Sequence, residues 1–195
     1  MNAETFSKTP LDDVCCIYQS KTVETFTLSK DKFDELWFLH PDRYHTVKMF
    51  GKNMPTPRWQ QAYGKNYRYT GAENNSLPIP DELKLFLHWS QTHIDQRLNG
   101  ILVNWYDGTK GHYIGAHRDD TRDLCNNSPI VTISLGEERI FRMRPYGKPG
   151  YKDFLFSNGQ VIVIPYSTNE LWTHEVPNFT KYTRKRISVT LRAYL

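Results

Sequence analysis

The first regular pattern along the chain is a stretch in which apolar residues recur every three to four positions. In residues 29–40, "SKDKFDELWFLH", the side chains of Phe33, Leu36 and Trp37 share one face of a helix. Ser29 precedes them and is a residue type that caps helix N-termini with its hydroxyl. The pattern therefore predicts an amphipathic helix over residues 29–40.

A second helical pattern runs from Pro80 to about Leu98. Proline suits the first turn of a helix, because its missing N–H would have no partner there. The apolar stripe of this helix consists of Leu83, Phe86, Leu87 and Ile94. Between the two helices, residues 49–75 are rich in glycine, proline, aromatic rings and cations, which indicates exposed loops and short hairpins.

From residue 99 onward the pattern changes to short segments of β-branched and aromatic residues separated by turn residues. The segments are GILVNWYDG, SPIVTISLG, RIFRMRP, KDFLFSNGQVIVIP, ELWTHEVP and RKRISVTLRAYL. Residues 157–160 predict a hairpin turn, since Asn-Gly readily adopts positive φ. This pattern indicates a mostly β, α+β fold, in which two supporting helices pack against a jelly roll.

Composition narrows the class of protein. With 195 residues the chain suits one compact domain, and its net charge of +4 permits an anionic partner without proving one. No apolar run approaches the roughly 20 residues of a membrane span, and the N-terminus lacks a signal-peptide core. The three cysteines form neither a disulfide framework nor a zinc-finger pattern. We therefore expect an intracellular, reducing compartment, either nucleus or cytoplasm.

Candidate metal ligands occur in "HYIGAHRDD". In a strand, residues two apart point to the same side, so His117 and Asp119 would present an imidazole and a carboxylate to one point. His174, 57 positions later in "LWTHEVP", could supply the third ligand. Such a set suits iron, which keeps open positions, whereas zinc prefers four tetrahedral ligands. The alternative is a pair of ordinary surface residues, since His-x-Asp alone is a weak signal.

The last predicted strand carries further candidate chemistry. Arg186, Thr190 and Arg192 fall on one side of it, between apolar residues. Inward guanidinium groups are costly to bury unless they meet anions, and guanidinium binds a carboxylate in bidentate fashion. A dicarboxylate would meet this requirement, and Asn104 and Tyr106, also two apart, could bond the same ligand. The alternative is a solvated sheet face.

Taken together, these motifs resemble the AlkB family of Fe(II)/2-oxoglutarate-dependent dioxygenases over roughly residues 48–195. The matching signatures are Asn-x-Tyr, His-x-Asp, a distal histidine and Arg-x5-Arg, in the family's order. The resemblance implies that Fe(II) is held by His117, Asp119 and His174, and that dioxygen is the oxidant. It also implies that 2-oxoglutarate is bound by Asn104, Tyr106, Arg186, Thr190 and Arg192, with Arg186 at its distal carboxylate.

The segment before the core is similar to the nucleotide-recognition region of the branch that repairs duplex DNA. In that branch a Phe-Gly-Lys finger enters the base stack, and an aromatic ring holds the flipped base against the first iron-binding histidine. Phe50, Gly51 and Lys52 occupy the finger position, and Tyr69 falls at the stacking position. The remaining residues that the resemblance assigns to the substrate are Arg58, Gln60, Tyr63, Tyr67, Arg118 and Thr121.

The implied function is oxidative demethylation of DNA. The enzyme would flip out a base of the 1-methyladenine or 3-methylcytosine type and release formaldehyde, succinate and carbon dioxide. It would act as a monomer on double-stranded DNA. The implied organisation is a single domain, 1–195. Within it lie an N-terminal extension and helix (1–47), the nucleotide-recognition loops (48–76) and the jelly-roll catalytic core (77–195).

Two departures from the family pattern bear on this interpretation. Ser188 stands where the family has asparagine, and Thr121 stands where relatives commonly have an acidic residue that contacts a cationic base. The lesion preference is therefore open. Alternative functions are a related oxygenase acting on RNA or protein, a His/Asp/His zinc hydrolase, and a catalytically silent nucleic-acid-binding module.

Overall fold

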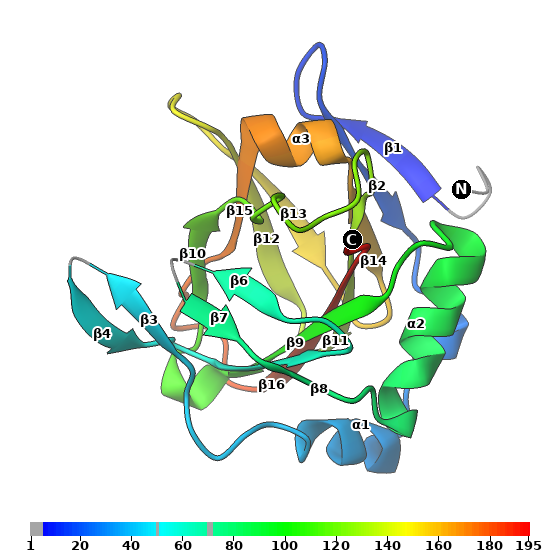
Figure 1. Cartoon of the computed structure of the whole chain (residues 1–195), viewed down its shortest axis with the longest axis vertical. Helices are drawn as coiled ribbons and strands as arrows, with labels where there is room; N and C mark the ends of the chain where they lie inside the picture. Colours follow the sequence, from blue (N-terminus) through cyan, green and yellow to red (C-terminus); the bar gives the residue numbers. More distant parts are fainter. Residues whose placement is uncertain (1–5, 50, 70–71) are drawn as a thin grey trace.

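The structure, a computed structural model, describes residues 6–49, 51–69 and 72–195. Its main element is an eight-stranded sheet, antiparallel except where β5 pairs with β8 (Figure 1). In spatial order the strands of this major sheet are β1 (Phe6–Pro10), β2 (Cys16–Ser20), β14 (Val161–Ile164), β11 (Ile130–Gly136), β16 (Lys185–Arg192), β9 (Gly100–Asp107), β5 (Trp59–Tyr63) and β8 (Ser76–Leu77).

A four-stranded antiparallel minor sheet packs against one face of the major sheet. Its strands, in order, are β10 (Ile114–His117), β15 (Trp172–Val176), β12 (Arg139–Pro145) and β13 (Lys152–Phe156). Apolar side chains from both sheets form a shared core that includes Ile162 and Ile164 on one side and Phe141 and Met143 on the other. The mostly β, jelly-roll fold predicted from the sequence is therefore confirmed.

Two separate two-stranded ribbons project beside the sheets (Figure 1). The first pairs β3 (Thr46–Met49) with β4 (Lys52–Pro55), and the second pairs β6 (Tyr67–Tyr69) with β7 (Ala72–Asn74). The second ribbon falls within segment 48–76, which the sequence assigns to nucleotide recognition, and the first begins two residues before it. The strand between them, β5, belongs instead to the major sheet, where it pairs with β9.

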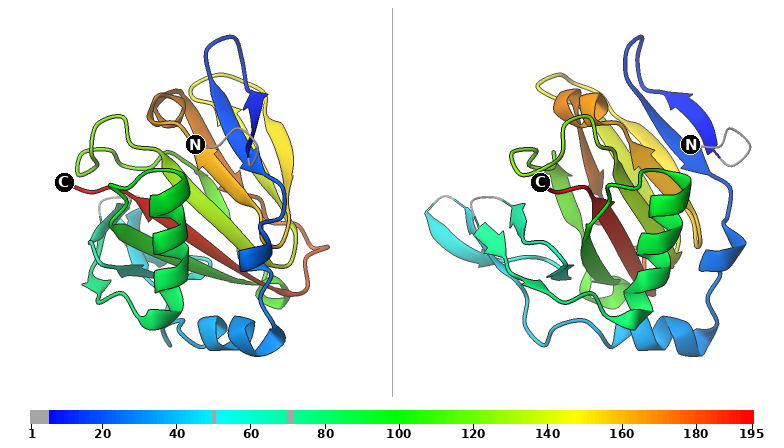
Figure 2. Two further views of the ribbon diagram at one scale, coloured as in Figure 1. Left: turned by 90° about the vertical axis from the view of Figure 1, so that its right-hand side faces the viewer. Right: turned by 45° about the vertical axis from the view of Figure 1, so that its right-hand side comes forward.

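Helices α1 (Lys30–Trp37) and α2 (Asp81–His93) cover the outer face of the major sheet (Figure 2). Leu36 and Trp37 of α1 and Leu83 and Phe86 of α2 are buried in one cluster with the outward residues of that sheet. As predicted, the Ser29 side chain caps α1 by accepting a hydrogen bond from the main-chain N–H of residue 32. Two 3-10 turns, Glu24–Phe26 and Gly108–Lys110, lie in the connections.

Three details differ from the sequence prediction. Helix α2 ends at His93 rather than near Leu98, because the Asp95 carboxylate accepts from the Arg97 N–H and forms a turn there. Residues 157–160 do form a turn, with Gly159 at φ +76°, but it joins β13 of the minor sheet to β14 of the major sheet. It is therefore a connection between sheets and not a hairpin.

The third difference is a short helix, α3 (Tyr166–Leu171), which the sequence analysis did not predict. It joins β14 to β15 and therefore immediately precedes the strand that carries His174. The N-terminal hairpin of β1 and β2 was also unassigned, and it extends the major sheet beside β14. In the described part of the chain, no helix is both long and apolar enough to span a membrane.

Candidate metal centre

The face of the major sheet that meets the minor sheet is polar at its centre. Strand alternation turns Val103, Trp105 and Val189 outward to the helices, and it turns their neighbours inward. The inward side chains line a pocket between the two sheets, and they are Leu102, Asn104, Tyr106, Thr132, Arg186, Ser188, Thr190 and Arg192. Because so many polar groups are buried together, this pocket is the strongest candidate for a ligand site in the described residues.

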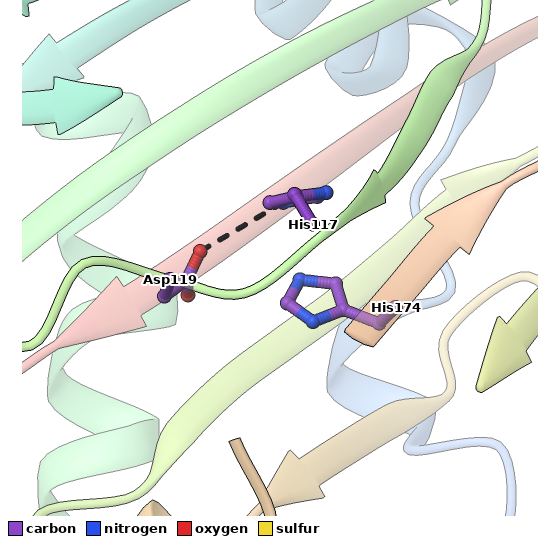
Figure 3. Close-up of side chains that lie close together, drawn as sticks. All are labelled: His117, Asp119 and His174. Atoms are coloured by element: carbon purple, nitrogen blue, oxygen red, sulfur yellow. Dashed lines mark ion pairs between the residues drawn. The ribbon is translucent and has the colours of Figure 1, made fainter. Parts of the chain in front are cut away.

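His117 and His174 come together by strand pairing. They are direct partners in the register of β10 and β15, and their ring centroids lie 4.3 Å apart. Asp119 follows shortly after β10 ends, and Figure 3 shows its carboxylate turned toward His117. One ligand atom from each of the three side chains lies within 4.8 Å of the others. The structure thus brings together the three residues that the sequence proposed as ligands.

The reason expected for the position of Asp119 is wrong, however. Alternation within a strand cannot align it with His117, because β10 ends at His117 itself. Hydrogen bonds hold the carboxylate instead. Arg192 donates from Nε to Oδ2 at 2.8 Å, and its Nη2 lies 2.7 Å from the same oxygen in an ion pair. The Tyr67 hydroxyl donates to Oδ1 at 3.3 Å. The Nε2 of His117 lies 3.8 Å from the same Oδ1.

These surroundings set the protonation states of the three groups. Burial alone would raise the pKa of Asp119, but the charge of Arg192 and the two neighbouring imidazoles lower it to about 2. Burial lowers the pKa of His117 to about 3 and also lowers the pKa of His174. His117 donates from Nδ1 to the Gly115 carbonyl at 2.8 Å, which leaves the Nε2 lone pair for the cluster. Two neutral imidazoles and one carboxylate form the protonation state that binds a cation.

A comparison with known families decides what kind of protein carries this cluster. Residues 23–192 match the sequence profile of the 2OG-Fe(II) oxygenase superfamily. The chain belongs to that superfamily. Fe(II), 2-oxoglutarate and dioxygen are accordingly the cofactor and cosubstrates of its family, and the cluster of two histidines and one aspartate supplies a donor set suited to iron.

Individual relatives sharpen the comparison. Over 161 residues the oxygenase is 31% identical to human "DNA oxidative demethylase ALKBH2", covering 76% of this chain and 61% of that protein. It is 26% identical to mouse "Alpha-ketoglutarate-dependent dioxygenase alkB homolog 3", covering 71% and 52%. The chain therefore spans less than two thirds of the length of these relatives.

Solved structures agree on the fold. The structure described as "The structure of OsALKBH1" aligns with a TM-score of 0.61 at 16% identity, covering 96% of this chain and 100% of that chain. A 2OG-Fe(II) family oxidoreductase from Burkholderia pseudomallei aligns with a TM-score of 0.57 at 17% identity, covering 90% and 84%. At these identities the likeness concerns the fold alone.

Arg186 lies near the opposite end of β16 from Arg192, the residue that binds Asp119. It is 1% exposed, its Nε donates to the Ser134 hydroxyl at 3.0 Å, and its guanidinium lies 5.2 Å from the Tyr106 ring centroid. Its Nη1 has no hydrogen-bond partner among the described residues. Burial lowers the pKa of Arg186 to about 10, which leaves the group charged at neutral pH. A buried cation in this position calls for an anionic ligand.

The other predicted pocket residues differ in what they contact. Asn104, Tyr106 and Thr190 all line the pocket, as expected from their strand positions. Arg192 also lines it, but Asp119 already meets its charge. Of the two arginines described in the pocket lining, Arg186 is therefore the one without a carboxylate partner among the described residues. Thr132 and Ser134 were missed by the sequence analysis. Their signal was present, because they are polar residues two apart in an otherwise apolar strand.

Three residues assigned to the substrate are buried. Arg58 is 1% exposed and donates to the side-chain oxygens of Asn104 at 2.8 Å and Gln60 at 2.9 Å. Gln60 is also 1% exposed, and Tyr63 is buried in the cluster beneath the helices. The expected contact of Arg58, Gln60 and Tyr63 with the substrate stays a prediction, and the exposure expected for this segment is wrong, because β5 is a strand of the major sheet.

The remaining substrate candidates lie at or near the surface, with one exception. Tyr67 is buried, with its hydroxyl on Asp119. Arg118 is exposed, and its guanidinium lies 3.8 Å from the Tyr146 ring centroid. Gly51 and Lys52 are exposed in the first ribbon, and Thr121 is half-buried. Phe50 and the side chain of Tyr69 lie outside the described residues.

Proposed function

We propose that the chain is an Fe(II)/2-oxoglutarate-dependent oxidative demethylase acting on DNA. It would remove N-alkyl groups of the 1-methyladenine or 3-methylcytosine type and release formaldehyde, succinate and carbon dioxide. The observation that carries the proposal is the cluster of His117, Asp119 and His174, whose two histidines line the same pocket as the buried cation of Arg186.

The residues present fit a ferrous ion. His117 and His174 offer neutral imidazoles and Asp119 an ionised carboxylate, and three ligands leave room for other molecules to bind. When bound, the ion would couple the oxidative decarboxylation of 2-oxoglutarate by dioxygen to oxidation of the substrate's N-alkyl carbon. The protein's own part is to hold these ligands deprotonated and fixed, through Arg192 and Tyr67 on Asp119.

The residues present also fit 2-oxoglutarate. Arg186 would bind its distal carboxylate, because a buried guanidinium with a polar N–H free among the described residues gains most from an anion. Asn104, Tyr106 and Thr190 would line the path from Arg186 to the metal ligands. Arg58 would help by fixing the amide of Asn104, to which it donates.

DNA is proposed as the substrate on two grounds. A relative that shares 31% identity with the chain is described as a DNA oxidative demethylase. The two ribbons beside the sheets also present cations to solvent, among them Lys52 and Arg68, of which Arg68 pairs with Asp123. Since the ligand cluster is buried between two sheets, a base could reach it only after leaving the stack. Segment 48–76 would then act in nucleotide recognition, with residues 77–195 as the catalytic core.

The compartment and assembly are part of the same proposal. All three cysteines are free thiols, two of them adjacent at Cys15 and Cys16, which suits an intracellular, reducing environment. The protein would work as a monomer on double-stranded DNA.

One experiment tests the central proposal. Fe(II) and 2-oxoglutarate are titrated into the protein without oxygen, and methylated DNA, RNA and peptide are then supplied separately with oxygen. We expect succinate release together with loss of the methyl mass from DNA. An Asp119→Ala variant serves as the inactive control. Demethylation of RNA or peptide alone would overturn the DNA assignment, and a wild-type protein that binds no metal would overturn the enzymatic one.

Phe50→Ala tests the choice of duplex DNA. An apolar wedge is useful only where a flipped base leaves a gap in a stack. Losing the wedge should therefore lower the demethylation rate about tenfold on duplex and much less on single strands, since unstacking costs a few kcal/mol. The matched control is Phe38→Ala, which removes a 75% exposed ring at the end of α1. Equal losses on both substrates would contradict the wedge.

A further inference from the structure

Two of the three candidate ligands are placed by the sheet, and the third is not. His117 and His174 face each other across β10 and β15, so main-chain hydrogen bonds of the minor sheet fix their spacing. Asp119 follows the end of β10, and residues 118–120 have no strand partner. Its main chain must be held by other means if the carboxylate is to stay beside the imidazoles.

Asn169 supplies those means. The main-chain N–H of Asp119 donates to the Asn169 side-chain oxygen at 2.9 Å, and the Asn169 amide donates back to the Asp119 carbonyl at 3.1 Å. A carboxamide offers an acceptor and donors in one plane, as a peptide group does. The two bonds from Asn169 therefore take the place of the main-chain hydrogen bonds that a neighbouring strand would make with Asp119. Because an N–H only donates and a carbonyl only accepts, the two bonds also fix which way the amide points.

The amide is well placed to act as a rigid support. Asn169 is 1% exposed, so water does not compete for its two bonds. It belongs to α3, and the preceding residue, Thr168, binds the main chain of Cys16 in β2 through its hydroxyl, donating at 2.8 Å. The main-chain carbonyl of the following residue, Glu170, accepts from the Arg118 guanidinium at 2.8 Å. Consecutive residues of α3 therefore tie the ligand loop to the major sheet.

We propose that Asn169 is a positioning residue of the metal centre, which holds the main chain of Asp119 so that its carboxylate shares a cation with His117 and His174. The inference rests on the proposed function, in that these three residues are taken to bind iron. Asn169 touches none of the reacting groups and acts only through Asp119.

The consequence of losing the amide follows from what else holds Asp119. Arg192 and Tyr67 still bind the two carboxylate oxygens, and they do so from β16 and β6. Without Asn169 the main chain is free to follow the side chain toward these strands. Substitutions behind a metal ligand commonly weaken metal affinity by about 10- to 100-fold, and we expect a loss of this size.

The test measures metal binding and not only turnover. Metal-free full-length protein is titrated with Co(II) without oxygen, and the dissociation constant and the visible absorption spectrum of bound Co(II) are recorded. Asn169→Ala removes both bonds, and Asn169→Asp keeps the acceptor but sets an oxygen against the Asp119 carbonyl. Both variants should bind Co(II) about 10- to 100-fold more weakly, with an altered spectrum.

The matched control is Asn158→Ala. Asn158 likewise accepts from a main-chain N–H, that of Gly136 at 2.9 Å, but it lies in the turn between the two sheets and contacts none of the three ligands. It should leave the Co(II) dissociation constant unchanged. Circular dichroism and thermal unfolding show which variants fold, and Asn169→Ser, which keeps a small polar side chain, is measured if the alanine variant does not.

A second readout separates positioning from general damage. At saturating metal, the affinity of Asn169 variants for 2-oxoglutarate should stay within about twofold of wild type, because the hydrogen bond that holds Arg186 comes from Ser134 and not from Asn169 or Asp119. If wild type binds Co(II) and the folded Asn169 variants bind it equally well, the inference is wrong and the proposed function stands. Equal weakening by Asn158→Ala would also overturn it. If wild type itself binds no metal, the proposed function fails first.

Discussion

The pocket between the sheets and the ribbons beside it are built in opposite ways. In β16, which forms the floor of the pocket, every residue after the first is buried, including two arginines. In β4 of the first ribbon every residue is exposed. The pocket holds its charged groups in place by hydrogen bonds inside the protein, whereas the ribbon leaves its polar groups to water. The difference teaches that chemistry and recognition place contrary demands on the same small fold.

Physical reasons support this division. A buried guanidinium or carboxylate is tolerated only with a well-oriented partner, as Arg192 and Asp119 provide for each other, so the pocket must be formed before any ligand arrives. An isolated two-stranded ribbon has little core of its own and is marginally stable in water. It gains stability when a partner covers it, which suits a surface that closes on a large substrate.

The largest expected effect is at the metal ligands. His174→Ala removes one of three donors, and turnover should fall by more than about a thousandfold, since a catalytic metal contributes several kcal/mol or more to the transition state. Succinate release and Co(II) titration measure the loss. The exposed His93→Ala on α2 serves as control and should retain full activity. Near-wild-type turnover in His174→Ala would remove the ligand assignment.

A paired stability measurement tests whether the two regions differ as described. Leu135 is fully buried in β11, and Leu135→Ala should lower the free energy of unfolding by about 2–5 kcal/mol through the cavity it leaves. Met54 is 48% exposed in β4, and Met54→Ala should change the free energy of unfolding by no more than about 0.5 kcal/mol. Urea denaturation gives both values. Similar losses would mean that the ribbon is as tightly packed as the sheet.

A smaller effect is expected at the far end of the pocket. Arg186→Gln removes the buried cation, and the KM for 2-oxoglutarate should rise about 10- to 100-fold, as for a charge-assisted hydrogen bond worth about 1.5–3 kcal/mol. Metal affinity should change little. Arg144→Gln on the outer face of the minor sheet is the control, since its partner is Glu175. An unchanged KM would place the cosubstrate elsewhere.

The smallest effect is expected at Thr121, which belongs to the recognition side. Thr121→Glu adds a carboxylate where the side chain is half-buried, and it should raise the preference for cationic methylated bases about two- to fivefold. Thr121→Gln, the neutral counterpart, should not. Competition between methylated and unmethylated oligonucleotides measures the preference. An equal gain in both variants would attribute the effect to size and not to charge.

The sequence predicted the strands of the core and the grouping of the three candidate ligands well, for identifiable reasons. Strands such as β11 and β16 consist of β-branched residues bounded by turn residues, a local signal that needs no tertiary information. The grouping of His117, Asp119 and His174 was recoverable because the motifs occur together and in order. What failed were inferences that depend on which face of a strand is covered.

Arg58 shows why the prediction of exposed loops failed for its segment. An arginine in a loop-like segment is usually exposed, and nothing local reveals that β5 joins a sheet whose inner face needs a donor for Asn104. Helix α3 was not predicted for a different reason. Its sequence, YSTNEL, is too short to show a helical period, and its value lies in hydrogen bonds to residues far away in the chain. Both errors reflect contacts that only the folded chain defines.

The pairing of β10 with β15 carries one more consequence. Ile114 opposes Val176 and His117 opposes His174. Between these two pairs β10 advances by three residues, whereas β15 advances by two. Such an extra residue is a β-bulge, which bends its strand and increases its local twist. Deleting Gly115 or Ala116 would make the pairing of β10 with β15 regular. It would also change the direction of the loop that follows β10 and carries Asp119. The number of residues in this short strand therefore determines where the candidate ligands lie, as much as the identity of the three side chains does.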